Sequence, residues 1–218
     1  MIRTQCKDDV KKTIEKMGIF EEGFLASNVR LSDYPICVET GTCLGESTER
    51  IRQLFPRVYT IEIEPSLHER AFHMFDNVTC ILGDSAVELK RLLPRLDKPT
   101  VFFLDAHWSG DSSTDWEHSD FSGYGVDTGK RGEGTSWEDQ VPLLDEIAAI
   151  VEFPHRCVIY VDDADKFDRS GQGLKDKGFL GEDWSGVHLK DIMVALEPRM
   201  ELVTMNGHQL VVVLREIL

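Results

Sequence analysis

The stretch that decides the fold runs from residue 36 to residue 54 and reads ICVETGTCLGESTERIRQL. Its first residues, Ile36–Val38, form an apolar run that is typical of a buried strand. Two glycines, Gly41 and Gly45, then mark a tight turn, and from Glu46 to Leu54 apolar residues recur at helical spacing. The stretch therefore predicts a strand, a glycine turn and a helix in direct succession.

The alternation of strand and helix continues along the chain. Short apolar runs predict further strands at Val58–Ile63, Val78–Leu82, Thr100–Leu104 and Cys157–Val161. Between and after them, amphipathic stretches predict helices at Ser66–Phe75, Ser85–Leu93, Val141–Val151 and Val187–Leu196. The chain closes on two apolar runs, Glu201–Met205 and Gln209–Arg215, which are joined by the hairpin signal Asn206-Gly207. These elements predict one doubly wound α/β domain over residues 1–218 with a terminal hairpin.

The composition is that of a globular protein, with 41% hydrophobic and 29% charged residues in a chain of 218. The formal net charge of −15 would repel a phosphate backbone or an anionic lipid surface, so we expect no nucleic acid and no membrane as partner. The 5 cysteines lack a C-x-x-C pair, which predicts no disulfide framework and favours a reducing compartment. Because residues 1–16 are polar and no long apolar run follows, we expect a cytoplasmic protein.

Two segments, residues 109–140 and residues 166–186, break the alternation. Both are rich in glycine and polar residues and lack an apolar period. Each follows a predicted strand at its carboxyl end, where open α/β sheets bind ligands. We therefore expect long loops that form a mobile wall or lid over a substrate pocket, or else surface insertions without a function. Residues 1–35 are expected to form an N-terminal helical segment.

The glycine turn and the next two strand ends carry groups that suit an adenosine ligand. The spacing Gly41-x-x-x-Gly45 is neither the dinucleotide fingerprint nor a triphosphate P-loop, although a plain tight turn would explain it as well. Glu62, 21 residues after Gly41, is placed to accept hydrogen bonds from ribose hydroxyls, and Asp84 from an adenine amino group. Because these positions are acidic, a neutral or cationic adenosine ligand fits better than one with an additional phosphate.

The order of these motifs resembles a class I S-adenosylmethionine (SAM)-dependent methyltransferase. The resemblance covers about residues 36–164 and rests on Glu39-Thr40-Gly41-Thr42-x-x-Gly45, Ile61-Glu62-x-x-Pro65, Gly83-Asp84-Ser85 and Phe103-Leu104-Asp105. It implies a Rossmann-like sheet of seven strands with an antiparallel last strand. It also implies SAM as cofactor.

The resemblance further implies which residues contact the cofactor. The methionine part would lie against Glu39, Gly41, Thr42 and Gly45, and the ribose against Glu62. Ser47 and Ile63 are further expected cofactor-binding residues. The adenine would lie beside Gly83, Asp84 and Ser85, with Asp105 also next to the cofactor. Two of these residues have a structural alternative, because Glu39 could bond turn amides and Asp84 could be a helix N-cap.

Three aspartates at the ends of the fourth and fifth predicted strands suggest a metal site. Asp105, Asp162 and Asp163 would meet at one edge of the sheet, where their carboxylates repel one another unless a cation joins them. Such oxygen ligands favour Mg²⁺, with Mn²⁺ or Ca²⁺ as alternatives, although Asp162-Asp163 could also be a strand-end turn. The arrangement resembles the divalent-metal-dependent O-methyltransferases of the catechol and macrocin types. Asp163 departs from the asparagine usual in the catechol type.

Near these aspartates, His107 is the candidate catalytic residue together with Asp105. It could take a proton from the substrate, bind the metal or serve a structural role. The four tryptophans in or beside the two long segments suit either an apolar substrate wall or packing anchors; they are Trp108, Trp116, Trp137 and Trp184.

The prediction for function is therefore a SAM-dependent methyltransferase that uses a divalent metal to methylate a hydroxyl of a small molecule, such as a sugar, a polyol or a natural product. The metal would lower the pKa of the hydroxyl and fix its orientation. One alternative is a metal-independent N- or carboxyl-methyltransferase. Others are a non-enzymatic α/β binding module and an NAD-linked oxidoreductase, the latter disfavoured by the glycine spacing.

Overall fold

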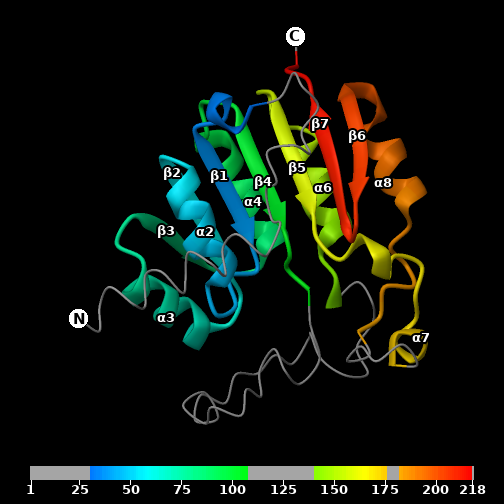
Figure 1. The fold of residues 1–218 in the computed structure, drawn as a ribbon, viewed down its shortest axis with the longest axis horizontal. Coiled ribbons are helices and arrows are strands. Elements are labelled where there is room, and N and C mark those ends of the chain that lie inside the picture. Colours follow the sequence, from blue (N-terminus) through cyan, green and yellow to red (C-terminus); the bar gives the residue numbers. More distant parts are fainter. Residues whose placement is uncertain (1–29, 108–139, 176–181, 218) are drawn as a thin grey trace.

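The computed structural model describes residues 30–107, 140–175 and 182–217 (Figure 1). They form a seven-stranded sheet with the order β3-β2-β1-β4-β5-β7-β6. Strands β1 to β5 are parallel, and β7 is antiparallel to both β5 and β6. The strands are β1 (Ile36–Thr40), β2 (Arg57–Glu62), β3 (Val78–Leu82), β4 (Thr100–Leu104), β5 (Cys157–Val161), β6 (Met200–Asn206) and β7 (Gln209–Leu214). The predicted α/β class, with a doubly wound sheet and a terminal antiparallel hairpin, is confirmed.

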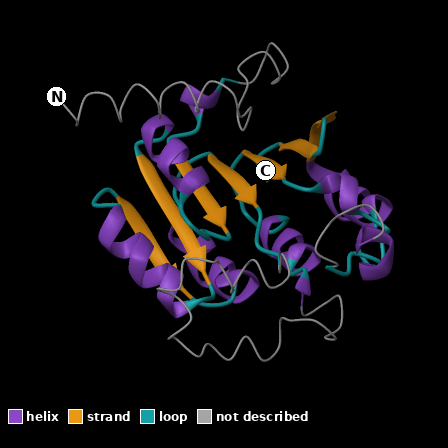
Figure 2. Ribbon diagram, turned by 60° about the horizontal axis from the view of Figure 1, so that its bottom comes forward, coloured by secondary structure: helices purple, strands orange, loops and turns teal. Residues whose placement is uncertain are grey.

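Helices cover both faces of this sheet (Figure 2). The larger apolar cluster joins one face of the sheet to α4, α6 and α8, and a smaller cluster joins the other face to α2. The α-helices are α2 (Glu46–Leu54), α3 (Pro65–Met74), α4 (Ser85–Leu92), α6 (Leu143–Ile150), α7 (Gly171–Lys175) and α8 (Leu189–Leu196). Short 3₁₀ turns are η1 (Leu31–Asp33), η2 (Leu93–Arg95), η4 (Ala164–Lys166) and η5 (Glu197–Arg199). No helix in the described ranges combines the length and the apolar character needed to cross a membrane.

The central strands are apolar along their whole length because both of their faces are covered. Every residue of β4 and β5 is buried. On β4, Phe102 and Leu104 belong to the larger cluster, whereas Val101 and Phe103 belong to the smaller one. This alternation explains why the sequence shows a continuous apolar run here instead of a period of two.

The described parts of the segment 166–186, residues 166–175 and 182–186, contain more regular structure than the sequence suggested. They include the end of η4 and the short helix α7, and they bury Leu174 and Trp184 in the larger cluster. In the sequence these two apolar residues stand among glycines and polar residues, so they give no periodic signal. The expected loop at 109–140 falls almost wholly outside the described residues, as does most of the segment 1–35.

The turn between β1 and α2 needs a glycine at position 41. Gly41 has a φ of +81°, and a Cβ there would lie 2.4 Å from the backbone oxygen of Asp105. Its N–H donates to the carbonyl oxygen of Ile61 at 2.9 Å, so the turn cannot move away without breaking the ladder. The glycine therefore permits the close approach of the β1 and β4 ends.

Replacing Gly41 by alanine should destabilise the fold by about 2–4 kcal/mol, because backbone strain and a clash with another backbone act together. The control is Gly207→Ala in the β6–β7 turn, where φ is +58° and nothing lies within 4 Å of the added Cβ. The control should lose only about 1 kcal/mol through strain. Urea unfolding measures both, and equal losses would contradict the close approach at Gly41.

Candidate active site

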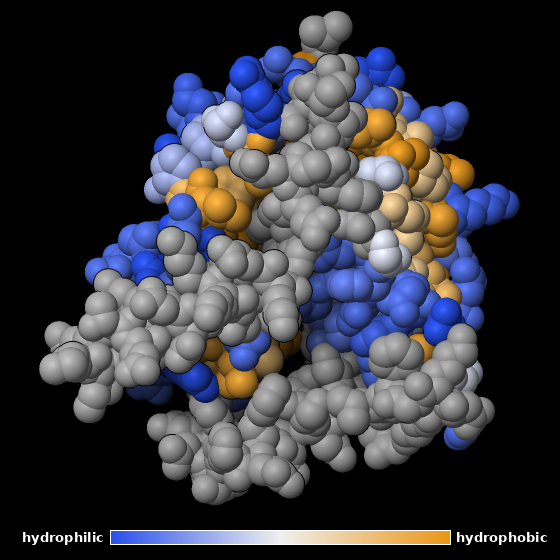
Figure 3. Space-filling model, in the orientation of Figure 1, coloured by the Kyte–Doolittle hydropathy of each residue, from blue (hydrophilic) through white to orange (hydrophobic). Residues whose placement is uncertain are grey.

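The residues expected at the site lie at or just beyond the carboxyl ends of β1 to β5, and backbone hydrogen bonds hold the ends of β1, β4 and β5 in register. The N–H of Asp105 donates to the oxygen of Thr40 at 3.1 Å, and that of Asp162 donates to the oxygen of Leu104 at 3.0 Å. The ladder thus extends beyond the strands and carries the polar residues with it. The lower right of the described surface in Figure 3, at this edge of the sheet, is hydrophilic.

Glu62 ends β2 with its carboxylate fastened to the backbone. Its Oε2 accepts a hydrogen bond from the N–H of Cys43 at 2.8 Å, and its Oε1 accepts one from the N–H of Glu64 at 2.9 Å. The side chain is only 6% exposed, and burial raises its pKa although hydrogen bonds from the amides of Glu64, Cys43 and Ile63 oppose this shift. A carboxylate can accept about four hydrogen bonds, so Glu62 keeps acceptor capacity for a ligand beside the β1–α2 turn.

Glu39 is fully buried and is bonded by hydroxyls instead of turn amides. Its Oε2 accepts hydrogen bonds from the hydroxyls of Thr48 at 2.5 Å and Thr60 at 2.7 Å, and Ser47 also bonds to the carboxylate. Its Oε1 has no hydrogen-bond partner among the described residues. Burial raises the pKa of Glu39 to about 7, against the effect of these hydroxyls. Glu39 therefore joins β1, β2 and α2 from inside the fold.

The other residues expected around the cofactor have mixed surroundings. The hydroxyl of Thr42 is hydrogen-bonded to that of Thr60 at 2.6 Å, and Ser85 is buried. Asp84 is the N-cap of α4, because its Oδ1 accepts from the N–H of Val87 at 3.2 Å. By contrast, the side chain of Ile63 is exposed next to Glu62, where it offers an apolar surface.

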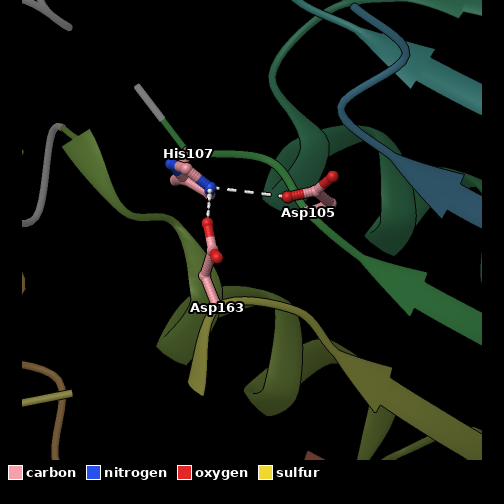
Figure 4. A group of neighbouring side chains, drawn as sticks. All are labelled: Asp105, His107 and Asp163. Atoms are coloured by element: carbon pink, nitrogen blue, oxygen red, sulfur yellow. Dashed lines mark ion pairs between the residues drawn. The ribbon is translucent and has the colours of Figure 1, made fainter. Parts of the chain in front are cut away.

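A second group consists of Asp105, His107 and Asp163 (Figure 4). The Nε2 atom of His107 lies 2.9 Å from Oδ2 of Asp163 and 3.4 Å from Oδ1 of Asp105. One ligand atom from each residue lies within 4.8 Å of the other two, a spacing that suits a single metal ion. Burial lowers the pKa of His107, but the hydrogen bonds to the two aspartates outweigh it and raise the pKa to about 10. Without a metal the ring is therefore protonated at neutral pH.

The backbone at Asp163 turns its side chain toward His107, whereas Asp162 is oriented differently. Asp163 has a φ of +55°, in the left-handed region. The Oδ1 atom of Asp162 accepts from the N–H of Asp163 at 3.1 Å and from Nε2 of Gln209 at 3.3 Å, and lies 3.1 Å from Nε2 of His208. Of the three expected metal ligands, the structure brings Asp105 and Asp163 together with His107, and Asp162 lies outside that group.

Several residues at this site were not expected from the sequence. Lys166 lies with its Nζ 2.8 Å from Oδ2 of Asp163, and it also forms an ion pair with the buried Glu182. Lys166 lies three residues after Asp163, a spacing from which this ion pair could have been predicted. Glu182 is 16 residues away, so its ion pair with Lys166 could not be predicted from the sequence. The ring of Trp184 lies edge-on to His107, 5.0 Å between centroids, so this tryptophan is a buried packing residue.

A small cavity lies beside the same group. Its polar lining comes from Asp105, His107, Glu146, Asp162 and Trp184, and its volume is about 10 Å³, room for about one water molecule. Glu146, on α6, is buried and adds a further carboxylate to this end of the sheet. Its place on the apolar face of an amphipathic helix explains why the sequence pattern gives no sign of it.

No known protein family matches the sequence, and no curated protein matches it. Among solved structures, a SAM-dependent methyltransferase from Anabaena variabilis is similar, with 12% identity, 87% of this chain and 79% of that chain covered, and a TM-score of 0.50. The SAH-bound methyltransferase PaMTH1 from Podospora anserina shares 15% identity over 84% of this chain and 72% of its own, with a TM-score of 0.49. The mitomycin 7-O-methyltransferase MmcR shares 16% identity over 87% of this chain, with a TM-score of 0.47. This chain spans 51% of MmcR, about half its length.

At these identities the likeness shows the fold alone. The chain has the Rossmann-like fold of SAM-dependent methyltransferases.

The pKa of Glu39 makes stability depend on pH. In the unfolded chain this carboxyl ionises near its ordinary pKa of 4.5, whereas in the folded protein it keeps its proton up to about 7. The folded state thus binds more protons in this window, and stability falls as pH rises through it, by about 3 kcal/mol at most.

The glutamine in Glu39→Gln cannot ionise, so the variant should not lose stability in this way as the pH rises. The stability of the variant relative to the wild type should therefore rise by about 2–3 kcal/mol between pH 5 and pH 8 in urea unfolding. The exposed Glu152→Gln serves as a control and should show no such change. If the difference in unfolding free energy between Glu39→Gln and the wild type is the same at pH 5 and pH 8, the pKa of Glu39 is not raised.

Proposed function

We propose that this protein is a SAM-dependent methyltransferase. The observation that carries the proposal is the carboxylate of Glu62, held at the end of β2 by the amides of Cys43 and Glu64. A carboxylate fixed in this way is preorganised to accept hydrogen bonds from the two hydroxyls of a ribose. The likeness in fold supports the same function.

The surroundings of Glu62 fit the rest of such a cofactor. Gly41 and Gly45 both have a positive φ, which lets the turn from β1 to α2 close tightly beside Glu62. The exposed Ile63 offers apolar surface for a purine ring. SAM itself would supply the electrophilic methyl group, and the protein would bind and orient it.

Glu62→Ala should weaken the binding of S-adenosylhomocysteine at least tenfold, because two charge-assisted hydrogen bonds of about 1.5–3 kcal/mol each are lost. Calorimetric titration measures the affinity, and circular dichroism checks that the fold persists. Glu69→Ala, an exposed acid on α3, is the matched control and should bind normally. Unchanged affinity in Glu62→Ala would exclude the ribose assignment.

We further propose that Asp105, His107 and Asp163 bind a divalent cation, with Mg²⁺ favoured and Mn²⁺ or Ca²⁺ as alternatives. The support is the donor set of the group. Two carboxylates and one imidazole each offer a ligand atom, and these atoms lie within 4.8 Å of one another. Carboxylate oxygens and imidazole nitrogens are common ligands of divalent cations in proteins. Asp162 lines the small cavity beside the same group.

The reaction that fits this arrangement is methyl transfer to the hydroxyl of a small molecule, a sugar, a polyol or a natural product. The cation would lower the pKa of the hydroxyl. Asp105 follows β4, next to the glycine turn of β1, so the two candidate sites share one edge of the sheet. This proximity would bring the acceptor oxygen and the methyl donor together, which is the main contribution that positioning makes to such a reaction.

A metal-independent methyltransferase is the second candidate, because His107 and Lys166 already pair with Asp163. The two candidates predict different responses to Mg²⁺. With a cation site, saturating Mg²⁺ should raise the melting temperature by about 5–10 °C through mass action, and a chelator should reverse the shift. Turnover should stop when the cation is removed.

The shift should be largely lost in Asp163→Asn and His107→Ala. It should be reduced less in Asp162→Asn, whose side chain lies outside the group. Each variant is compared with its own metal-free melting temperature, and the exposed Asp191→Asn is the control. If the wild type shows no shift and methyl transfer survives the chelator, the metal-independent enzyme is the correct function.

A further inference from the structure

Lys166 is a buried lysine whose ammonium group lies against the candidate cation site. The residue is 5% exposed, and lysines are rarely so buried unless they are paired. Its Nζ atom is 2.8 Å from Oδ2 of Asp163 and is also paired with Oε1 of Glu182, a residue that is 2% exposed. The ammonium is thus held between two carboxylates in the interior.

The surroundings keep this ammonium in place. Lys166 belongs to η4, where its N–H donates to the carbonyl oxygen of Asp163 at 2.8 Å, and its Nζ lies 5.9 Å from the centre of the Trp184 ring. The segment that carries Glu182 is itself fastened, because the N–H of Asp183 donates to Oε1 of Gln140 at 2.7 Å. Moving Lys166 to solvent would therefore leave the buried Glu182 without this partner.

The contact with Asp163 involves the same oxygen that faces the cation site. Oδ2 of Asp163 is 2.9 Å from Nε2 of His107 and 2.8 Å from Nζ of Lys166. A cation bound by Asp105, His107 and Asp163 would thus share this carboxylate with the ammonium. Because like charges repel strongly where water is scarce, the ammonium must lower the affinity of the site for a divalent cation.

We propose that Lys166 is the internal counter-ion of the cation site. It neutralises Asp163 when the site holds no metal, and it limits the affinity of the site for Mg²⁺ or Mn²⁺ when one binds. This inference rests on the cation site proposed above. Glu182 holds the ammonium in position, and the site is consequently one for a weakly held, exchangeable cation.

The test is calorimetric titration of the full chain with Mn²⁺ and, separately, Mg²⁺. Lys166→Met removes the charge but keeps the length of the side chain, and it should bind either cation at least tenfold more tightly than the wild type. Lys166→Arg keeps the charge and should remain close to the wild type. Lys190→Met, on the exposed face of α8, is the control and should have no effect.

The double variant Asp163→Asn/Lys166→Met sharpens the test. Asp163→Asn alone should weaken cation binding at least tenfold, and the added Lys166→Met should restore most of the loss, since the pair as a whole is electrically neutral. If Lys166→Met leaves Glu182 uncompensated and fails to fold, Lys166→Met/Glu182→Gln replaces the ion pair by neutral groups. This variant should also bind more tightly, because the ammonium is closer to the site than Glu182.

The outcomes separate this inference from the proposed cation site. If the wild type binds the cation and both Lys166→Met variants bind it equally well or more weakly, Lys166 does not limit the affinity. The cation site itself would still be supported. Binding by a Lys166→Met variant alone would support the role, since the ammonium would then suppress the site. No binding by any of them would overturn the cation site and the inference together.

Discussion

The hydrogen bonds that extend the parallel ladder beyond β1 and β4 are the interaction on which the site depends. They join the N–H of Asp105 to Thr40 and that of Asp162 to Leu104, so the residues after three neighbouring strands stay in register. Parallel strands point the same way, and their polar ends therefore gather at one edge. The close approach leaves no room for a side chain at Gly41, which explains the glycine there.

Gathering acids at one edge requires that their charges be compensated, and the protein does this in two ways. Glu62 and Glu39 are stabilised by neutral donors, backbone amides in the first case and hydroxyls in the second. Asp163 is stabilised by charged donors, His107 and Lys166. The amides that hold Glu62 leave its carboxylate able to accept hydrogen bonds from a ligand, whereas the charged donors on Asp163 compete with any cation that binds there.

This difference divides the edge into two functional parts. The part around Glu62 suits an uncharged diol, because hydrogen bonds to hydroxyls need an acceptor and no change in charge. The part around Asp163 suits a cation, but one that must share its ligand with an ammonium group. The proposed methyltransferase with an exchangeable metal would account for both parts, since cofactor and cation would then bind at adjacent strand ends and share only Asp105.

The sequence by itself determined the strands, the helices other than α7 and the glycine turn, because these depend on local patterns. Apolar runs marked β4 and β5, and Asn206-Gly207 marked the hairpin. The sequence offers two interpretations of Asp84, a cofactor contact and a helix N-cap. The hydrogen bond from the N–H of Val87 joins residues three apart, so the N-cap is a local feature that the sequence can suggest.

Only the tertiary structure decided which acids meet and what compensates them. The sequence could not separate Asp162 from Asp163, because their directions depend on a left-handed backbone at Asp163 and on Gln209, which comes from β7. The pairing of Lys166 with Glu182 joins residues 16 apart across a segment without an apolar period. Contacts of this kind form when separate elements pack together, so they leave no periodic or motif signal in the chain.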